Sequence, residues 1–336
     1  MSQPPSTVTH EGIVFKKLLG KYFARAAERT FECSISSRLR KQLIYPIAAP
    51  TDPKRRGKRV QAVRNIEVVD PVAIGDHVHV IEADHGTGVI TEVLPRRNKL
   101  VRPTAEKEGK HPLEQVIVAN LDQVVAVFSL HPDPKWHMLD RYLTMAEATN
   151  IPALICLTKL DLADNAETLE AIAEEYRRIG YPTLLTSALN VTGIEALKGA
   201  LCGKLSALIG KSGAGKTTLL NAIQPGLGLR VNAVNAHTSE GKHTTTHLEM
   251  FDLDFGGSVV DTPGLRLFKL WDVPMEELAS LLPEMRPYVG RCQFGLDCTH
   301  THEPGCAIKA GVNSGGISVR RYESYLNMKA YFYDRS

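Results

Sequence analysis

Residues 210–217 read Gly-Lys-Ser-Gly-Ala-Gly-Lys-Thr and match the phosphate-loop pattern G-x-x-x-x-G-K-[ST] at every fixed position. The apolar run 205–209 predicts a buried strand before the loop, and residues 218–223 predict a helix after it. Glycines let successive N–H groups turn toward phosphate oxygens, and the helix N-terminus adds a positive dipole. We expect Lys216 to reach the terminal phosphates and Thr217 to ligate Mg²⁺. The predicted nucleotide contacts here are Gly210, Lys211, Ser212, Gly213, Ala214, Gly215, Lys216, Thr217 and Thr218.

Length and composition indicate a globular protein of several domains. A chain of 336 residues fits two or three domains. No stretch approaches the roughly 20 consecutive apolar residues of a membrane span, and the polar N-terminus lacks the pattern of a secretory signal. We therefore expect a cytoplasmic monomer that binds no membrane. Six cysteines in a cytosolic chain argue for a metal site or core packing and against a disulfide framework.

Charge is distributed unevenly along the chain. Residues 1–111 carry 20 Lys and Arg against 12 Asp and Glu, whereas residues 112–336 carry 20 against 25. The densest basic run is 54–59, Lys-Arg-Arg-Gly-Lys-Arg. This asymmetry predicts that the first third of the chain faces a polyanion such as RNA. The alternative is a solvated basic loop without a partner.

The N-terminal third predicts a small β-barrel. After a disordered tail at 1–10, short segments of alternating apolar and polar residues are separated by turn formers. These predicted strands are 12–15, 22–26, 31–35, 77–80 and 88–93. Together with the positive charge they favour an oligonucleotide-binding (OB) barrel over residues 11–103, with a structural cap as the alternative.

Beyond a polar linker at 104–115, strands alternate with amphipathic helices. The predicted strands are 123–128, 152–157, 182–185, 205–209, 247–253 and 257–260, and the predicted helices are 138–149, 166–179, 193–201 and 218–223. Such alternation is typical of a mostly parallel sheet with helices on both faces, whose ligands bind at the carboxyl ends of the strands. We assign residues 116–270 to this α/β domain.

Companion motifs around the same strand ends indicate guanine as the base. Thr158-Lys159-Leu160-Asp161 is similar to N-K-x-D, in which the Asp carboxylate accepts two hydrogen bonds from guanine that adenine cannot donate. Ser187-Ala188 resembles the turn that caps guanine O6. Asp261-Thr262-Pro263-Gly264 matches D-x-x-G, whose Asp holds Mg²⁺ through water and whose Gly senses the γ-phosphate. Each motif alone is weak, and their convergence argues against an ordinary glycine-rich turn.

The order of these motifs is permuted. The guanine motifs precede the phosphate loop, whereas an ordinary GTPase places them last. Circular permutation changes only which surface connections are cut, so the geometry at the strand ends survives. The segment 241–246, Gly-Lys-His-Thr-Thr-Thr, stands where a switch threonine meets Mg²⁺, and we predict Thr245 for that contact.

Three cysteines and a histidine near the C-terminus predict a structural Zn²⁺ site. Three thiolates and an imidazole are supplied by Cys292, Cys298, His300 and Cys306, and these four ligands complete the tetrahedral coordination of a zinc ion. His302 is the alternative to His300 as a ligand, and reduced core cysteines are the alternative to a metal site. Helices at 275–282 and 318–333 would complete a small α-helical zinc domain over 271–336.

In this combination the chain resembles the RsgA family of circularly permuted GTPases. The resemblance includes residues 75–76, 120–123, 140–143, 241–246 and 261–264, and the cysteine–histidine cluster. It implies an OB barrel that binds ribosomal RNA, a central GTPase domain and a zinc domain. It also implies GTP hydrolysis that the small ribosomal subunit stimulates and that is coupled to release from the subunit during late maturation.

The chain departs from common patterns at three points. Thr158 stands where Asn is usual, which predicts a weaker contact to guanine N7 and a weaker tie to the phosphate loop. Cys292 and Cys298 are separated by five residues where four are commoner. Leu265 follows the D-x-x-G motif and cannot orient water as a glutamine does, so we predict that His243 takes this role, as the resemblance also suggests.

Two alternative functions use the same motifs. A phosphotransferase leaves 158–161 and 187–188 unexplained. An RNA-binding scaffold with a degenerate, structural nucleotide site is the other alternative, although Lys216, Thr217 and Asp261 are intact.

Overall fold

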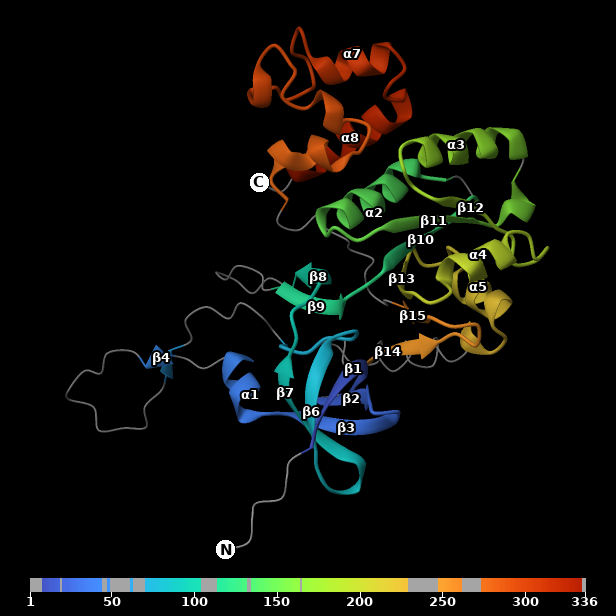
Figure 1. Ribbon diagram of the computed structural model, residues 1–336. Coiled ribbons are helices and arrows are strands. Elements are labelled where there is room, and N and C mark those ends of the chain that lie inside the picture. Colours follow the sequence, from blue (N-terminus) through green and yellow to red (C-terminus); the bar gives the residue numbers. More distant parts are fainter. Residues whose placement is uncertain are drawn as a thin grey trace, which may run out of the picture. The chain divides into compact units, whose positions relative to one another are not determined.

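The computed structural model forms two compact units (Figure 1). The first comprises Met1–Leu121 and Ala233–Phe251, and the second comprises Asp122–Asn232 and Asp252–Ser336. The described residues are 8–18, 20–43, 47–48, 61–62, 70–103, 114–131, 134–163, 165–228, 247–261 and 273–333. The basic run at 54–59 lies outside them.

The first unit contains a closed β-barrel, as the sequence predicted. Its strands are β1 (Thr9–Leu18), β2 (Lys21–Ala26), β3 (Arg29–Ile35), β6 (His77–Glu82) and β7 (Thr87–Val93). They pair in the order β1-β2-β3-β7-β6, and β6 returns to β1 to close the ring. Alternating side chains such as Val14, Ala24 and Val80 are fully buried in its interior. Because β1 begins at Thr9, the last two residues of the predicted disordered tail belong to a strand.

Further elements of the first unit were not predicted. Helix α1 (Ser37–Leu43) follows β3, and the short strands β4 (Ile47–Ala48) and β5 (Gln61–Ala62) pair with each other. Strands β8 (Lys99–Pro103) and β9 (Glu114–Ala119) form an antiparallel pair, so the last two residues of the predicted linker belong to a strand. Strand β14 (His247–Asp252), by contrast, was predicted as a strand over 247–253, and it pairs with β1, with Lys16 opposite Glu249.

The second unit contains a parallel sheet, again as predicted. Its strands β10 (Gln123–Ser129), β11 (Ala153–Thr158), β12 (Thr183–Leu185), β13 (Leu205–Ile209) and β15 (Ser258–Asp261) lie in the order β12-β11-β10-β13-β15. Gln123–Phe128 is buried throughout, as expected for a central strand covered on both faces. The connecting helices are α2 (Trp136–Ala148), α3 (Ala166–Arg178), α4 (Ile194–Leu201) and α5 (Lys216–Ile223).

The strand order fixes where these helices lie. The chain moves along the sheet from β10 to β11 to β12 through right-handed crossovers, which place α2 and α3 on one face (Figure 1). The later crossovers run in the opposite direction along the sheet and place α4 and α5 on the other face. Local signals set the helix ends: the Asn165 side chain caps α3 by accepting a 3.0 Å hydrogen bond from Thr168 N. All strands of this sheet run parallel, so their carboxyl ends share one edge.

The C-terminal residues form a small module on α2. Its elements are the 3₁₀ turns η4 (Met275–Leu281), η5 (Arg286–Tyr288) and η6 (Gly295–Asp297), and the helices α7 (Ala307–Asn313) and α8 (Val319–Tyr333). The α-helix predicted at 275–282 is therefore a 3₁₀ helix, and α7 was missed. Within the described ranges, no helix is both long and apolar enough to cross a membrane.

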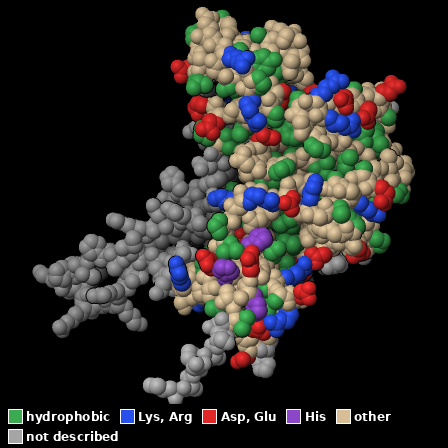
Figure 2. All heavy atoms as spheres, viewed as in Figure 1, with side chains coloured by type: hydrophobic (Ala, Val, Ile, Leu, Met, Phe, Trp, Pro, Cys, Tyr) green, Lys and Arg blue, Asp and Glu red, His purple; other side chains and the backbone are tan. Residues whose placement is uncertain are grey.

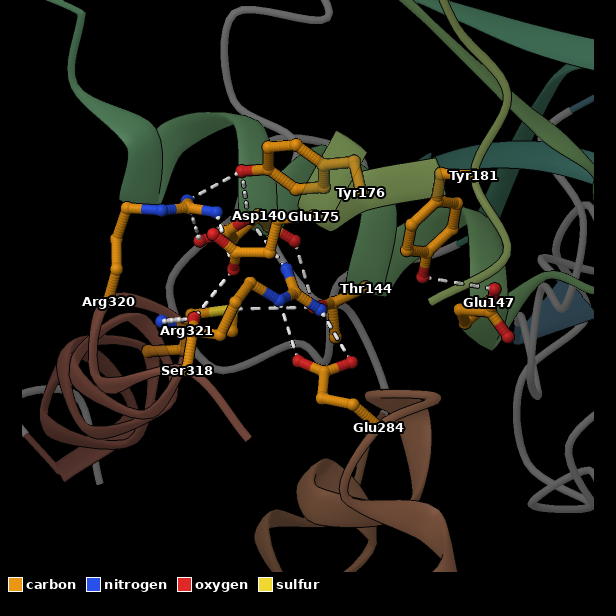
Figure 3. A network of polar contacts seen from close by, with 11 residues as sticks. Asp140, Thr144, Glu147, Glu175, Tyr176, Tyr181, Glu284, Ser318, Arg320 and Arg321 are labelled. Atoms are coloured by element: carbon orange, nitrogen blue, oxygen red, sulfur yellow. Dashed lines mark hydrogen bonds and ion pairs between the residues drawn. The ribbon is translucent and has the colours of Figure 1, made fainter. Parts of the chain in front are cut away.

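Buried charges join this module to α2 and α3 (Figure 3). Arg321 on α8 is 1% exposed and donates to Asp140 Oδ1 on α2 and to Glu284 Oε1, each at 2.6 Å. Tyr176 on α3 donates to the same Asp140 oxygen at 2.7 Å. Burial raises the pKa of Tyr176, which keeps its hydroxyl protonated as a donor. The guanidinium of Arg320 also donates to Tyr176 Oη, at 2.8 Å, and its carbon lies 4.8 Å from the tyrosine ring centroid.

Candidate functional site

The phosphate loop connects β13 to α5 at the carboxyl edge of the sheet. A Cβ on Gly210 would stand 2.3 Å from Val127 O, so only glycine fits beside β10. Gly213 and Gly215 have φ angles of +82° and +89°, which side chains other than glycine rarely adopt. Gly215 is the N-cap of α5, so the first N–H groups of the helix open into the loop. This is the strand–loop–helix context that the sequence predicted.

Lys216 extends back across the loop. Its ammonium donates to Gly210 O at 2.8 Å and approaches Lys211 O at 3.4 Å. The charge therefore lies among the backbone groups that would surround phosphate oxygens. Thr217 follows as the second residue of α5, in its first turn.

Thr158 ties the guanine motif to the phosphate loop. It is the last residue of β11 and is 4% exposed. Its hydroxyl donates to Ala214 O at 2.6 Å and lies 3.6 Å from the position of a Cβ on Gly215. Thr158 therefore connects the guanine motif to the phosphate loop by a buried hydrogen bond, while the predicted weakening relative to Asn stays a prediction.

The rest of the guanine motif forms a turn after Thr158. Lys159 adopts a left-handed φ of +63°, and Leu160 N donates to Thr186 O at 3.1 Å. The hydroxyl of Ser187 donates to Asp161 Oδ1. Ser187 is buried, so this bond fixes one carboxylate oxygen of Asp161 beside the Ser187-Ala188 turn. The two predicted guanine motifs are therefore in direct contact.

The Ser187 loop depends on residues that the sequence did not single out. Asn190 N donates to Ser187 Oγ at 3.1 Å, and Ser187 N donates to Thr192 O at 3.0 Å. Gly193 closes the loop with a φ of +70°, where a Cβ would stand 2.3 Å from Leu185 O. Ser187-Ala188 and the helix start at Gly193 were predicted, whereas the two hydrogen bonds come from backbone N–H donors, which depend on no particular residue type and had no signal in the sequence.

Asp261 ends β15 opposite Leu208 of β13. It is 9% exposed and belongs to the strand next to the one that leads into the phosphate loop. The remaining predicted nucleotide residues, His243, Thr245 and Gly264, lie outside the described residues, and their roles stay predictions.

The cysteine–histidine cluster forms a compact donor set. One ligand atom from each of Cys292, Cys298, His300 and Cys306 lies within 4.8 Å of every other, and all four residues are buried. Cys292 Sγ lies 3.4 Å from His300 Nδ1 and 3.9 Å from Cys306 Sγ. A tetrahedral zinc ion separates its ligand atoms by roughly 3.5 to 3.8 Å, so the donors present fit this ion. The five-residue spacing does not exclude Cys292 from the group.

The surroundings of the cluster support metal binding. Burial lowers the pKa of His300, which keeps the imidazole neutral with a lone pair for a metal. Ala307 N donates to Cys292 Sγ at 3.3 Å, and Tyr322 Oη donates to His300 O at 2.7 Å. The alternative ligand His302 is exposed and contacts Thr301 Oγ1 at 3.0 Å, outside the donor set.

The fold and these motifs define the class of protein. A phosphate loop, a contacting pair of guanine motifs and a strand-end aspartate share one edge of a parallel sheet, with the guanine motifs first in the chain. This is a circularly permuted GTPase. The RsgA GTPase family model matches residues 93–271, and the chain belongs to this family.

Relatives and solved structures agree with that assignment. The chain is 34% identical over 322 residues to the small ribosomal subunit biogenesis GTPase RsgA of Phocaeicola vulgatus, which covers 95% of this chain and 96% of the relative. It is 42% identical over 268 residues to the protein of the same name from Gemmatimonas aurantiaca, covering 79% and 86% of the two chains.

Two solved structures have the same fold. The crystal structure of YjeQ from Thermotoga maritima is 30% identical, with a TM-score of 0.72, and the match covers 98% of this chain and 100% of that one. YloQ, described as a circularly permuted GTPase, is 27% identical with a TM-score of 0.69, covering 100% and 99%.

Proposed function

We propose that this chain hydrolyses GTP to GDP and phosphate and acts in late maturation of the small ribosomal subunit as a nucleotide-controlled binding and release switch. The contact between the guanine motifs and the phosphate loop carries the proposal. The Thr158 hydroxyl donates to Ala214 O, and the Ser187 hydroxyl donates to Asp161, so the base-reading residues are connected to the phosphate loop. The relatives are named small ribosomal subunit biogenesis GTPases, which supports a role for this chain in maturation of that subunit. A phosphotransferase would leave this pair of guanine motifs unexplained.

The residues fit a guanine nucleotide with Mg²⁺. Asp161 would read the guanine edge, the backbone of 210–218 would hold the phosphates, and Thr217 and Asp261 would hold the metal. When bound, Mg²⁺ neutralises developing charge on the phosphate oxygens. Lys216 supplies a second positive charge to the terminal phosphates. In the C-terminal module, the Cys₃His set would hold one structural zinc ion per chain.

His243 is our candidate for orienting the attacking water, because Leu265 has no group that can do so. An imidazole nitrogen accepts a hydrogen bond from water and so aligns the water's lone pair with the γ-phosphate. Loss of subunit-stimulated turnover with retained nucleotide binding in His243→Ala would support this role, and normal stimulated turnover would refute it.

The proposed switch uses residues 237–247 and 261–268, which contain the predicted switch threonine and the D-x-x-G motif. GTP and Mg²⁺ would order residues 237–247 and 261–268, and hydrolysis would release them. The barrel over 11–103, the GTPase domain over 116–270 and the zinc domain over 271–336 would act together on the subunit and its ribosomal RNA. We propose that the protein does this as a cytoplasmic monomer.

Base recognition provides a direct test of the nucleotide site. Inosine triphosphate lacks the exocyclic amine of guanine and loses one hydrogen bond to the Asp161 carboxylate. A bond to a charged group contributes about 1.5–3 kcal/mol, so inosine triphosphate should bind about 10- to 100-fold more weakly than GTP. Equal affinity for the two nucleotides, measured by calorimetric titration, would reject this role for Asp161 and favour a degenerate, structural site.

A further inference from the structure

Two phenylalanines lie together on the outside of the barrel. Phe15 on β1 and Phe23 on β2 are partly exposed, and their ring centroids are 6.5 Å apart with an interplanar angle of 62°. Their neighbours Val14 and Ala24 are fully buried in the interior, so the alternation of the strands turns both rings outward. The barrel core does not account for this aromatic pair.

A β-bulge places Phe15 in this position. Val14 pairs with Ala24 and Lys16 pairs with Phe23, so Phe15 is the extra residue on β1. Bulges bend a strand and re-aim a side chain, and they are frequent beside binding sites. In OB barrels, the outer face around strands 2 and 3 binds oligonucleotides. Phe23 belongs to strand β2 of this barrel, and the bulge brings Phe15 beside it.

Cations flank the two rings. The guanidinium carbon of Arg25 lies 4.4 Å from the centroid of Phe15, and Arg25 is exposed. Lys16 Nζ lies 6.0 Å from the centroid of Phe23 and 2.9 Å from Glu249 Oε2. Aromatic faces beside arginine and lysine are what single-stranded nucleic acids bind, since bases stack on rings and phosphates pair with cations.

A second arginine–phenylalanine pair of the same barrel has a different environment. Arg29 lies 5.1 Å from the Phe31 centroid, but Phe31 is 1% exposed, and Glu82 accepts hydrogen bonds from both Arg29 nitrogens at 2.9 and 2.7 Å. The buried Phe31 ring has no face for a ligand. For that reason the pair formed by Arg29 and Phe31 offers a control for the pair formed by Arg25 and Phe15.

Another part of the barrel surface is unsuited to a polyanion. Histidine side chains gather there among acidic ones (Figure 2). His10 pairs with Glu82 at 3.2 Å, and His79 pairs with Glu92 at 3.1 Å. The carboxylates beside these histidines would repel phosphates.

From these contacts we propose that Phe15, Phe23 and Arg25 form a stacking platform for unpaired bases of single-stranded RNA. The inference deepens the proposed function and rests on it for the source of the RNA. Bases stack on the two rings, and the Arg25 guanidinium extends the planar surface or pairs with the adjoining phosphate. The platform is tolerant of sequence because every base has a π face.

The test measures binding of the full chain to a fluorescein-labelled single-stranded RNA of roughly 12 nucleotides by fluorescence anisotropy at low salt. Phe15→Leu and Phe23→Leu keep an apolar side chain but remove the stacking face, and each should weaken binding about tenfold. Phe23→Trp should retain binding because it restores a ring. Arg25→Ala should weaken binding, whereas Arg29→Ala should bind as the unchanged protein does.

Several outcomes would overturn the platform. These are wild-type affinity in both leucine variants, equal effects of Arg25→Ala and Arg29→Ala, or no RNA binding by the unchanged chain. Loss of subunit stimulation with unchanged oligonucleotide binding would show that a protein occupies this face, which also overturns it. GTP hydrolysis with small subunits is measured in parallel, so normal stimulation in the leucine variants with unchanged RNA binding rejects the platform and leaves the proposed function standing.

Discussion

Replacement of Arg321 by methionine tests how the C-terminal module is held on the GTPase fold. Arg321 is 1% exposed, and its partners Asp140 and Glu284 have side chains that are 0% and 3% exposed. Arg321→Met keeps the apolar length of the side chain but leaves two buried carboxylates without their shared cation. Removing one partner of a buried ion pair costs about 3–5 kcal/mol.

The free energy converts to a temperature shift. In a domain of about 150–250 residues, each kcal/mol lowers Tm by about 2–4 °C, so we expect a decrease of roughly 10 °C in the unfolding transition of the second unit. Differential scanning calorimetry measures the transition directly. Arg178→Met is the matched control, because Arg178 is 76% exposed and pairs with Glu174 at 3.5 Å only on the surface. That change should cost less than about 1 kcal/mol.

A third variant separates charge from packing. If the penalty comes from unpaired carboxylates, then adding Asp140→Asn and Glu284→Gln to Arg321→Met should recover much of the lost stability. A decrease for Arg321→Met no larger than that for Arg178→Met would refute the reasoning, as would a triple variant less stable than Arg321→Met alone.

Two further predictions concern the nucleotide and metal sites. Thr158→Val removes the hydroxyl that donates to Ala214 O, so it should lower the affinity for GTP, GDP and inosine triphosphate by about tenfold each. Thr158→Ser keeps a hydroxyl and should bind these nucleotides normally. Unchanged affinity of the valine variant, measured by calorimetric titration, would contradict the role of this hydrogen bond. Elemental analysis should find close to one zinc ion per chain. The Cys298→Ser variant should lose this zinc, whereas Cys202→Ser, at an exposed position outside the cluster, should keep it. A zinc content well below one per unchanged chain would exclude the site.

The sequence predicted much of this architecture because its signals are local. The phosphate loop, the alternation of apolar residues in the barrel strands and the β/α rhythm of the sheet each depend on near neighbours in the chain. The Cys₃His set was also predictable, since its four residues fall within fifteen positions, 292–306. The permuted order followed directly from where the motifs stand.

Features that depend on tertiary packing were not predictable. Asp140, Glu284 and Arg321 are charged residues that a sequence pattern assigns to the surface, and only the packing of α8 on α2 brings them together in the interior. The hydrogen bond from the Thr158 hydroxyl to Ala214 O was not predictable in its geometry, because residues 158 and 214 are far apart in the chain. The 3₁₀ geometry of η4 and the short helix α7 were missed because short helical turns have weak periodicity.

We propose that this chain is a GTPase controlled by the small ribosomal subunit. The decisive measurement is steady-state phosphate release from GTP and from ATP, each with and without purified small subunits. We predict strong stimulation by the subunits with GTP and none with ATP. An unstimulated rate with GTP, or turnover of ATP as fast as that of GTP, would contradict the claim.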